Sequence, residues 1–312
     1  MALFLTDEDV RALVSVADAL EAVEGSFRRL AGGTVENRPR YRLPLERGQL
    51  AVMAAVDREL GAGGVKTYAA GRGGRSFVFV LFDEATQELL AVMAADELGR
   101  LRTGAASGVA ARHLACRGAR SLGVIGCGHQ AEPQVEAIRL AVPGIERVVV
   151  YCRDQERREA FAARVGGEAG EGHGEAAGQD VVVTITNSRD PVLRGEWLQP
   201  GALVCAAGAN RPGARELDNV VLERAAFVCC DSKEDARLES SDLIEPVAQG
   251  VLDWLEVHEL GEVVAGEVVG RQADDDVVVF KSNGLAAWDV AVGALAFERA
   301  RDRGVGRELT PS

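Results

Sequence analysis

The sequence of 312 residues predicts a two-domain α/β protein. Three observations support this. The chain is longer than one ordinary hydrophobic core requires. Between residues 41 and 95, short β-rich runs follow one another through tight turns, which is typical of an antiparallel sheet. From residue 121 onward, strand, turn and helix patterns alternate, which is typical of a parallel sheet with crossover helices.

The first part of the chain is expected to hold one helix, four strands and a second helix. Thr6 is predicted to cap a helix whose apolar residues recur every three or four positions until Gly32 and Gly33. The strands are expected at 49–56, 64–70, 76–82 and 89–94. The alanine-rich run 101–116 predicts the helix that follows them.

The second part is expected to form the parallel sheet. Its strands are predicted at 121–125, 147–151, 180–184, 202–206, 227–230 and 277–281, and the glycine-rich segment 168–179 is predicted to be a loop. A last helix, 285–303, has an apolar face that could return to the first domain. We therefore expect one domain made of residues 1–112 plus 285–312, with residues 113–284 inserted as the other.

Composition excludes several classes of protein. A formal net charge of -13 repels phosphate backbones, so nucleic acid is not an expected partner. No apolar run approaches the roughly 20 residues that span a bilayer, and the first residues lack the basic start of a signal peptide. We expect a cytoplasmic protein that does not bind membranes. Its six cysteines lack metal-ligand spacing and are expected to be reduced core thiols.

The run Gly126-Cys127-Gly128-His129-Gln130-Ala131 matches a GxGxxA turn. It directly follows an apolar strand and precedes a helical stretch, which is the context that a dinucleotide-binding turn requires. Gly126 permits the tight turn, Gly128 lets the backbone approach a pyrophosphate, and the helix supplies its positive end. The pattern predicts a Rossmann domain, although a glycine turn without a ligand is the alternative.

The end of the second Rossmann strand bears on which dinucleotide is bound. Rossmann domains specific for NAD commonly place an acid there, but this chain continues with Cys152, Arg153 and Asp154. A small neutral residue followed by arginine leaves room for a 2′-phosphate and gives it a cation, which favours NADP(H) over NAD(H). The alternative is that Asp154 caps the next helix and Arg153 is solvated.

Three cations of the first domain are candidates for substrate contacts. Lys66 interrupts an otherwise apolar strand and could donate a proton if burial lowers its pKa, although an outward, solvated lysine is the ordinary alternative. Arg102 opens a helix of small residues, and its planar fork could hold a carboxylate. Arg40 follows Pro39 and, like Arg102, could also be an ordinary surface residue.

Taken together, these motifs resemble those of the ornithine cyclodeaminase and mu-crystallin family. The resemblance covers nearly the whole chain in order. Its elements are Arg38-Pro39-Arg40, Lys66 in its strand, residues 90–94, residues 101–106, the turn 126–131, residues 195–202, residues 212–218, residues 228–232 and Phe280-Lys281-Ser282-Asn283-Gly284.

The resemblance implies a homodimer whose first domain, a partly open β-barrel, binds substrate and forms the dimer. It also implies chemistry on amino acids or imino acids, with Arg40 and Arg102 on the substrate carboxylate and Lys66 binding substrate or transferring a proton. The nicotinamide would exchange hydride with the substrate α-carbon. The expected dinucleotide contacts are Arg102, Thr103, Gly126, Gly128, His129, Gln130, Cys152, Arg153, Asp154, Thr184, Ala206, Gly208 and Ser282.

Two positions depart from the cyclodeaminase pattern. Asn210 replaces the aspartate that activates the reacting amine, and Met53 replaces a glutamate near the side-chain amine. The expected function is therefore NAD(P)H-dependent reduction of a ketimine or cyclic imino acid, of the pyrroline-2-carboxylate or piperideine-2-carboxylate type. Alternatives are ornithine cyclodeaminase, an alanine dehydrogenase, a lyase acting on a hydroxyproline, and a non-catalytic NADPH-dependent binding protein.

Overall fold

The computed structural model describes residues 2–71 and 74–309, and the chain divides into two compact units. Unit 1 comprises Met1–Arg102 and Leu285–Ser312, and unit 2 comprises Thr103–Gly284. The first division falls after residue 102, whereas the sequence placed it after residue 112. Both positions lie within one helix, α3 (Asp96–Leu114), so no turn or linker marks the division in the sequence.

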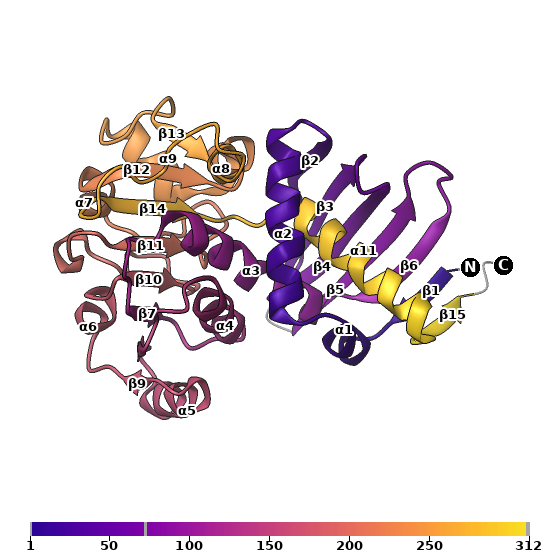
Figure 1. Cartoon of the computed structure of the whole chain (residues 1–312), viewed down its shortest axis with the longest axis horizontal. Helices are drawn as coiled ribbons and strands as arrows, with labels where there is room; N and C mark the ends of the chain where they lie inside the picture. The colour runs from indigo at the N-terminus through magenta and orange to yellow at the C-terminus, as the bar shows by residue number, and fades with distance from the viewer. Residues whose placement is uncertain (1, 72–73, 310–312) are drawn as a thin grey trace. The chain divides into compact units, whose positions relative to one another are not determined.

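Unit 1 is built on a seven-stranded mixed sheet with the order β15-β1-β6-β5-β4-β3-β2 (Figure 1). The strands are β1 (Ala2–Leu5), β2 (Val35–Leu45), β3 (Gly48–Asp57), β4 (Ala62–Gly71), β5 (Gly74–Asp83), β6 (Leu89–Ala94) and β15 (Arg307–Leu309). The four predicted strands are confirmed as β3 to β6. In the described ranges, no pairing joins β15 to β2, so the sheet is open at both edges.

Strand β2 was not among the predicted strands, because its sequence is typical of a loop. It is charged along much of its length and contains Pro39 and Pro44. Proline and charge are typical of edge strands, since one side of an edge strand has no neighbour to bond. The sheet order places β2 at the edge, which accounts for its composition.

The helices of unit 1 lie against one face of this sheet. The single helix predicted after Thr6 is wrong, because the chain forms α1 (Asp7–Leu13) and then α2 (Val16–Ala31). Ser15 starts α2 as the first residue of a capping box with Asp18. The last helix, α11 (Ala286–Arg303), packs on β3, β4 and α2 (Figure 1).

Unit 2 is an eight-stranded parallel sheet with the order β13-β12-β14-β11-β10-β7-β8-β9. The strands are β7 (Ser121–Ile125), β8 (Arg147–Tyr151), β9 (Glu168–Ala169), β10 (Val181–Thr184), β11 (Leu203–Ala206), β12 (Ala225–Cys230), β13 (Val257–Glu259) and β14 (Val277–Lys281). Strands β8 and β9 are added on one side of β7, and β10 and β11 on the other. The switch point between β7 and β10 is where Rossmann domains bind dinucleotides. The predicted Rossmann topology is confirmed.

The segment 168–179, predicted to be a loop, contains β9 and the helix α6 (His173–Ala177). Its glycines hid this structure from the sequence pattern. A Cβ added at Gly123 in β7 would lie 1.6 Å from the carbonyl oxygen of Ala176, so α6 sits directly on the strand backbone. Close backbone approach of this kind requires glycine.

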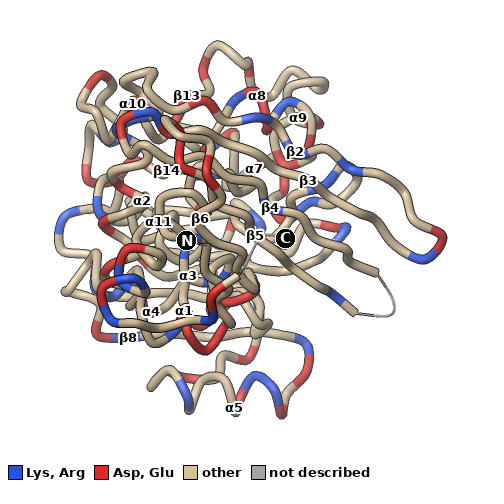
Figure 2. The backbone as a smooth tube through the Cα atoms, turned by 90° about the vertical axis from the view of Figure 1, so that its right-hand side faces the viewer, with Lys and Arg blue, Asp and Glu red and all other residues tan. Residues whose placement is uncertain are grey.

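The remaining helices of unit 2 connect the parallel strands. They are α4 (Ala131–Ala141), α5 (Gln155–Val165), α7 (Asn219–Glu223), α8 (Lys233–Glu239), α9 (Ser241–Ala248) and α10 (Leu260–Val264), with a 3-10 turn at Gly195–Trp197. Acidic and basic positions are interspersed along the backbone in both units (Figure 2). Within the described residues, every helix is too short or too polar to span a bilayer.

Candidate active site

In unit 1, Lys66 lies in the middle of β4 with its side chain on the face that α11 covers. It pairs across the sheet with Met53 of β3 and Phe79 of β5. Phe79 packs so closely under α11 that a Cβ added at Gly293 would lie 2.5 Å from its ring. Lys66 is only 2% exposed, which excludes the outward, solvated lysine that the sequence left open.

The acceptor for the Lys66 ammonium is Asp289, which sequence analysis did not single out. Its Oδ1 atom accepts a hydrogen bond from Lys66 Nζ at 2.8 Å and lies 3.4 Å from Arg102 Nε. Asp289 is completely buried on α11. A local signal existed, because Asp289 interrupts the apolar run from Ala286 to Val292.

The third cation, Arg40, is also buried and lies beside this group. It sits where the register of β2 against β3 shifts, between Arg38 and Tyr41. Burial lowers the pKa of Lys66 to about 8; Asp289 raises this pKa, and the charges of Arg102 and Arg40 lower it. The structure therefore brings the three predicted cations and Asp289 into one buried group, which we call the Lys66 cluster.

Arg102, a member of the cluster, and Gly99, which adjoins it, both lie on α3. The Arg102 guanidinium lies 5.7 Å from the centre of the Trp288 ring, and Trp288 in turn packs on Phe27. A Cβ added at Gly99 would lie 2.8 Å from Lys66 Nζ. Glycine at this helix position therefore leaves the space that the ammonium occupies.

The Lys66 cluster has capacity to bind an anion. One carboxylate cannot neutralise both Lys66 and Arg102, since it carries a single charge. The structure gives Arg102 no hydrogen-bonded acceptor among the described residues, and Asp289 Oδ2 is buried without a hydrogen-bond partner. A substrate carboxylate is the group that an arginine fork binds best.

Apolar and aromatic side chains adjoin the ammonium. Tyr68 and Phe77 lie two residues further along β4 and β5, on the same face, and their ring centres are 5.3 Å apart. Lys66 Nζ lies 5.8 Å from the Phe77 ring, and buried Met53 is the neighbour of Lys66 on β3. These surfaces suit a hydrocarbon side chain rather than a second charged group.

In unit 2, the GxGxxA turn has the geometry of a dinucleotide-binding turn. Gly126 has φ +119°, a backbone conformation that favours glycine, and its N–H donates to Tyr151 O at 2.9 Å. A Cβ added at Gly128 would meet nothing within 4 Å, so the space above it is open. Gln130 gives α4 no side-chain cap, and its Oε1 atom is buried without a partner. These features fit a pyrophosphate at the helix N-terminus.

Arginines surround the end of β8. Asp154 caps α5 by accepting from Arg157 N at 3.1 Å, as the sequence alternative proposed for this residue. Arg153 is exposed, and Arg158 donates to Cys152 O at 3.2 Å and lies over the Tyr151 ring. Sequence analysis did not single out Arg157 or Arg158, which add to the positive charge beside Cys152.

Several other predicted dinucleotide residues lie at the same end of the sheet, because the carboxyl ends of parallel strands are all on one side. Thr184 ends β10 with its Oγ1 buried and unpartnered, Ala206 ends β11, and Ser282 follows β14. Exposed His129 lies in the GxGxxA turn, whereas Thr103 lies on α3, where its carbonyl accepts from Gln134.

Buried charges fix the loop that carries Gly208 and Asn210. Glu216 accepts from the backbone N–H groups of Thr186, Gly208 and Ala209 at 2.7 to 2.9 Å. Lys281 donates to the carbonyls of Ala206 and Ala209 and lies 3.2 Å from Asp242. Burial raises the pKa of Glu216, although Lys281 opposes this effect. We call Glu216, Asp242 and Lys281 the Lys281 network.

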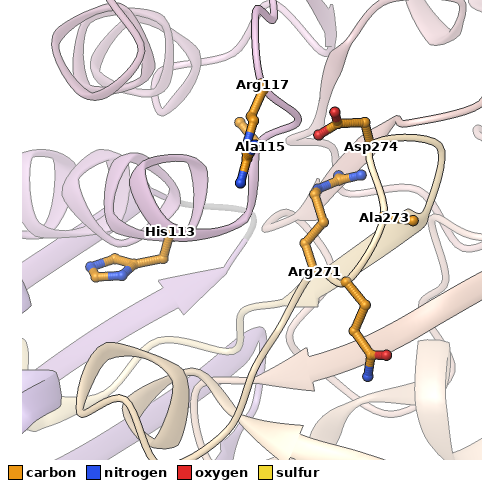
Figure 3. A pocket seen from close by; sticks show the side chains of 7 residues that line it. His113, Ala115, Arg117, Arg271, Ala273 and Asp274 are labelled. Carbon is orange, nitrogen blue, oxygen red and sulfur yellow. The ribbon is translucent and has the colours of Figure 1, made fainter.

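A cavity of about 420 Å³ lies at the amino ends of the strands of the unit 2 sheet (Figure 3). It is lined by residues that precede β7 and β14, including His113, Arg117, Arg271 and Asp274. Arg271 stabilises the fold, because it donates to the carbonyl oxygens of Leu114, Gly201 and Asp276. This cavity is therefore separate from the dinucleotide turn, which lies at the carboxyl ends of the strands.

A model of the ornithine cyclodeaminase/mu-crystallin family matches residues 1–304. The chain belongs to this family. Its sequence is 36% identical to alanine dehydrogenase of Archaeoglobus fulgidus, over 98% of each chain. The resemblance inferred from the sequence motifs is confirmed.

Solved structures agree with this assignment. Δ1-pyrroline-2-carboxylate reductase of Thermococcus litoralis, solved with NADH and L-proline, superposes with a TM-score of 0.93 at 31% identity, over 98% of this chain and 100% of that one. An archaeal alanine dehydrogenase dimer with bound NAD superposes with a TM-score of 0.94 at 35% identity, over 99% of each chain. In both, the match extends over both units.

Proposed function

We propose that this protein reduces a cyclic imino acid, of the pyrroline-2-carboxylate or piperideine-2-carboxylate type, to the corresponding amino acid with a nicotinamide dinucleotide. The observation that carries this proposal is the Lys66 cluster: a buried ammonium beside an arginine that has no hydrogen-bonded acceptor among the described residues. The family membership of the chain and the reductase solved with NADH and L-proline support it.

The residues divide the chemistry between them. Arg102 and Arg40 bind the substrate carboxylate, which fixes the imine relative to Lys66. Lys66 donates a proton to the imine nitrogen, and Lys66 then recovers a proton from solvent. The turn at Gly126 and Gly128 would hold the dinucleotide, which would supply the hydride for the C=N carbon. One hydride and one proton convert C=N to CH–NH.

Two features favour imine reduction over cyclisation of ornithine. Met53 is buried beside Lys66, where it offers no carboxylate to a side-chain amine. Asn210 cannot take a proton from that amine. Alanine dehydrogenase activity is the second candidate, since an alanine dehydrogenase is 36% identical to this chain.

We expect a preference for NADP(H) over NAD(H). The positive charge of exposed Arg153, with Arg157 and Arg158 nearby, would attract a 2′-phosphate. The same assay that tests the reaction tests this preference. We expect a higher kcat/KM with NADPH than with NADH, and the reverse ratio would contradict the preference.

The reaction is tested by oxidation of NAD(P)H in the presence of each cyclic imine, with proline or pipecolate identified as product. Lys66→Met should lower kcat by about 10²- to 10⁴-fold, the usual contribution of a general acid, and leave dinucleotide affinity unchanged. If the protein converts ornithine to proline and ammonia without net cofactor change, it is a cyclodeaminase and the proposal is wrong. Pyruvate formed from alanine would favour the dehydrogenase, and cofactor binding without any turnover would indicate a binding protein.

We further propose that the chain forms a homodimer through the face of the unit 1 sheet opposite Lys66. The row Tyr41, Val52, Thr67 and Val78 crosses four strands on that face, and Tyr41 is 63% exposed. The related alanine dehydrogenase is a dimer. Sedimentation equilibrium should give twice the chain mass of 33.0 kDa.

Tyr41→Glu should shift this mass toward the monomer, because it would bury a charge in the interface. Leu255→Glu is the matched control, since Leu255 is 86% exposed in unit 2 and lies outside the proposed face. A monomeric wild-type protein would refute the dimer.

A further inference from the structure

Asp289 differs from Asp57, another buried acid of unit 1 that pairs with a cation at close range. Asp57 is also completely buried, and both of its oxygens have partners: Oδ2 accepts from Arg29 Nε at 2.7 Å and Oδ1 from Leu60 N at 3.0 Å. Asp289 uses Oδ1 for Lys66 and leaves Oδ2 without a hydrogen-bond partner. Most buried acceptors are filled, as in Asp57. Asp242 Oδ2 also lacks a hydrogen bond, but it lies 3.2 Å from a lysine ammonium.

The ammonium of Lys66 faces charges from three other elements. Asp289 on α11 attracts it, whereas Arg102 on α3 and Arg40 on β2 repel it. Burial in the sheet further disfavours the charged form. Without a carboxylate in contact, the pKa of this lysine would be lower still, and a lysine that has lost its proton cannot act as an acid.

We propose that Asp289 is a positioning residue for the reaction: its carboxylate keeps the Lys66 ammonium charged and directed into the space left by Gly99. This inference rests on the proposed role of Lys66 as proton donor. Asp289 touches Lys66 and Arg102, so it acts through them on the substrate. A neutral lysine amine still carries two N–H donors, so the hydrogen bond to Asp289 Oδ1 can persist while Lys66 gives up its proton and recovers it.

The sign of the pH effect follows from these charges. Lys66 has a pKa of about 8 and must be protonated to act, so activity falls as pH rises through this value. Asp289→Asn removes the negative charge that raises the pKa, and the pKa of Lys66 moves down. We expect the alkaline limb of kcat/KM to shift to lower pH by about 1 to 3 units, the usual effect of one close charge. Near pH 8 the loss should then be about 5- to 500-fold.

The experiment compares the variant with the wild-type enzyme between about pH 5.5 and about pH 9.5. The ratio of the two kcat/KM values is plotted against pH, because titration of the imine itself then cancels. The ratio should lie near its maximum at low pH and fall as pH rises. An alkaline limb that stays where the wild type has it would overturn the inference.

Two further variants separate charge from position and from stability. Gly99→Ala should lower kcat at every pH without shifting the limb, because its methyl group displaces Nζ but leaves Asp289 in place. Asp57→Asn removes an equally buried carboxylate of unit 1, so it should lower thermal stability and leave the pH profile unchanged. A shift of the same size in Asp57→Asn would show a general loss of structure and overturn the inference.

Binding of pyrrole-2-carboxylate, measured by calorimetry, provides a readout that does not need turnover. Its affinity should decline with rising pH as Lys66 loses its charge, and in Asp289→Asn the decline should begin at lower pH. If the wild type reduces no cyclic imine but this shift occurs, the role of Asp289 stands and the proposed reaction fails. If the wild type reduces imines and neither profile shifts, the reaction stands and the role of Asp289 fails.

Discussion

Each unit buries a group of charged side chains, and the two groups differ in how fully they are paired. In the Lys281 network, Glu216 accepts bonds at both oxygens, and Lys281 has two carbonyls and Asp242 as partners. In the Lys66 cluster, Asp289 leaves one oxygen without a hydrogen bond, and Arg102 has an ion pair with no hydrogen-bonded acceptor. Asp242 Oδ2 also lacks a hydrogen bond, but it lies 3.2 Å from Lys281 Nζ. Among the described residues, the two groups therefore differ chiefly in their cations: Lys281 has hydrogen-bonded acceptors, and Arg102 has none.

This difference separates a structural role from a binding role. Taking a charge out of water is costly unless partners replace the lost solvent. The Lys281 network meets this requirement within the chain, so its charges hold the loop 206–210 in one conformation. The Lys66 cluster keeps donor capacity that a ligand can fill, which is the property of a preorganised site.

The largest expected effect comes from breaking the satisfied network. Lys281→Met leaves Glu216 and Asp242 buried as anions without their cation. Removing one partner of a buried pair costs about 3–5 kcal/mol of unfolding free energy. Urea unfolding followed by circular dichroism measures this loss. Lys66→Met should cost less, because Asp289 still has Arg102 beside it.

Lys233→Met is the control for this prediction, since Lys233 is a partly exposed lysine of the same unit. Its effect should stay within about 0.5 kcal/mol, as for ordinary surface substitutions. Equal losses for Lys281→Met and Lys66→Met would contradict the distinction between the two groups of charges.

The sequence predicted the elements whose signals are local. The turn at Gly126 lies within six residues and between a strand and a helix, and Lys66 is a single cation in an apolar strand. Both are visible without knowledge of the fold. The strands β3 to β6 were equally clear, because their β-rich runs end at turn residues.

The sequence could not predict pairings between distant residues. Lys66 and Asp289 are 223 residues apart, and only the packing of α11 on β4 brings them together. The roles of Glu216 and Asp242 were not predicted for the same reason. The edge strand β2 and the helix α6 were missed because proline, charge and glycine are typical of loops as well as of sheet edges and close packing.

The smaller prediction concerns the unsatisfied cluster. Arg102→Lys keeps the positive charge beside Asp289 but removes the planar fork that binds a carboxylate at two points. A charge-assisted hydrogen bond contributes about 1.5–3 kcal/mol, so KM for the imine should rise about 10- to 100-fold. We expect kcat to change little, because Lys66 and its contact with Asp289 remain.

Arg100→Lys on the same helix is the matched control, because Arg100 pairs with Glu97 at 2.7 Å, outside the Lys66 cluster. It should leave KM unchanged. Thermal unfolding of Arg102→Lys should stay close to that of the wild type, since the protein itself uses little of the hydrogen-bonding capacity of this guanidinium. An unfolding loss as large as that of Lys281→Met, with KM unchanged, would show that Arg102 serves the fold, and the contrast between the two units would no longer hold.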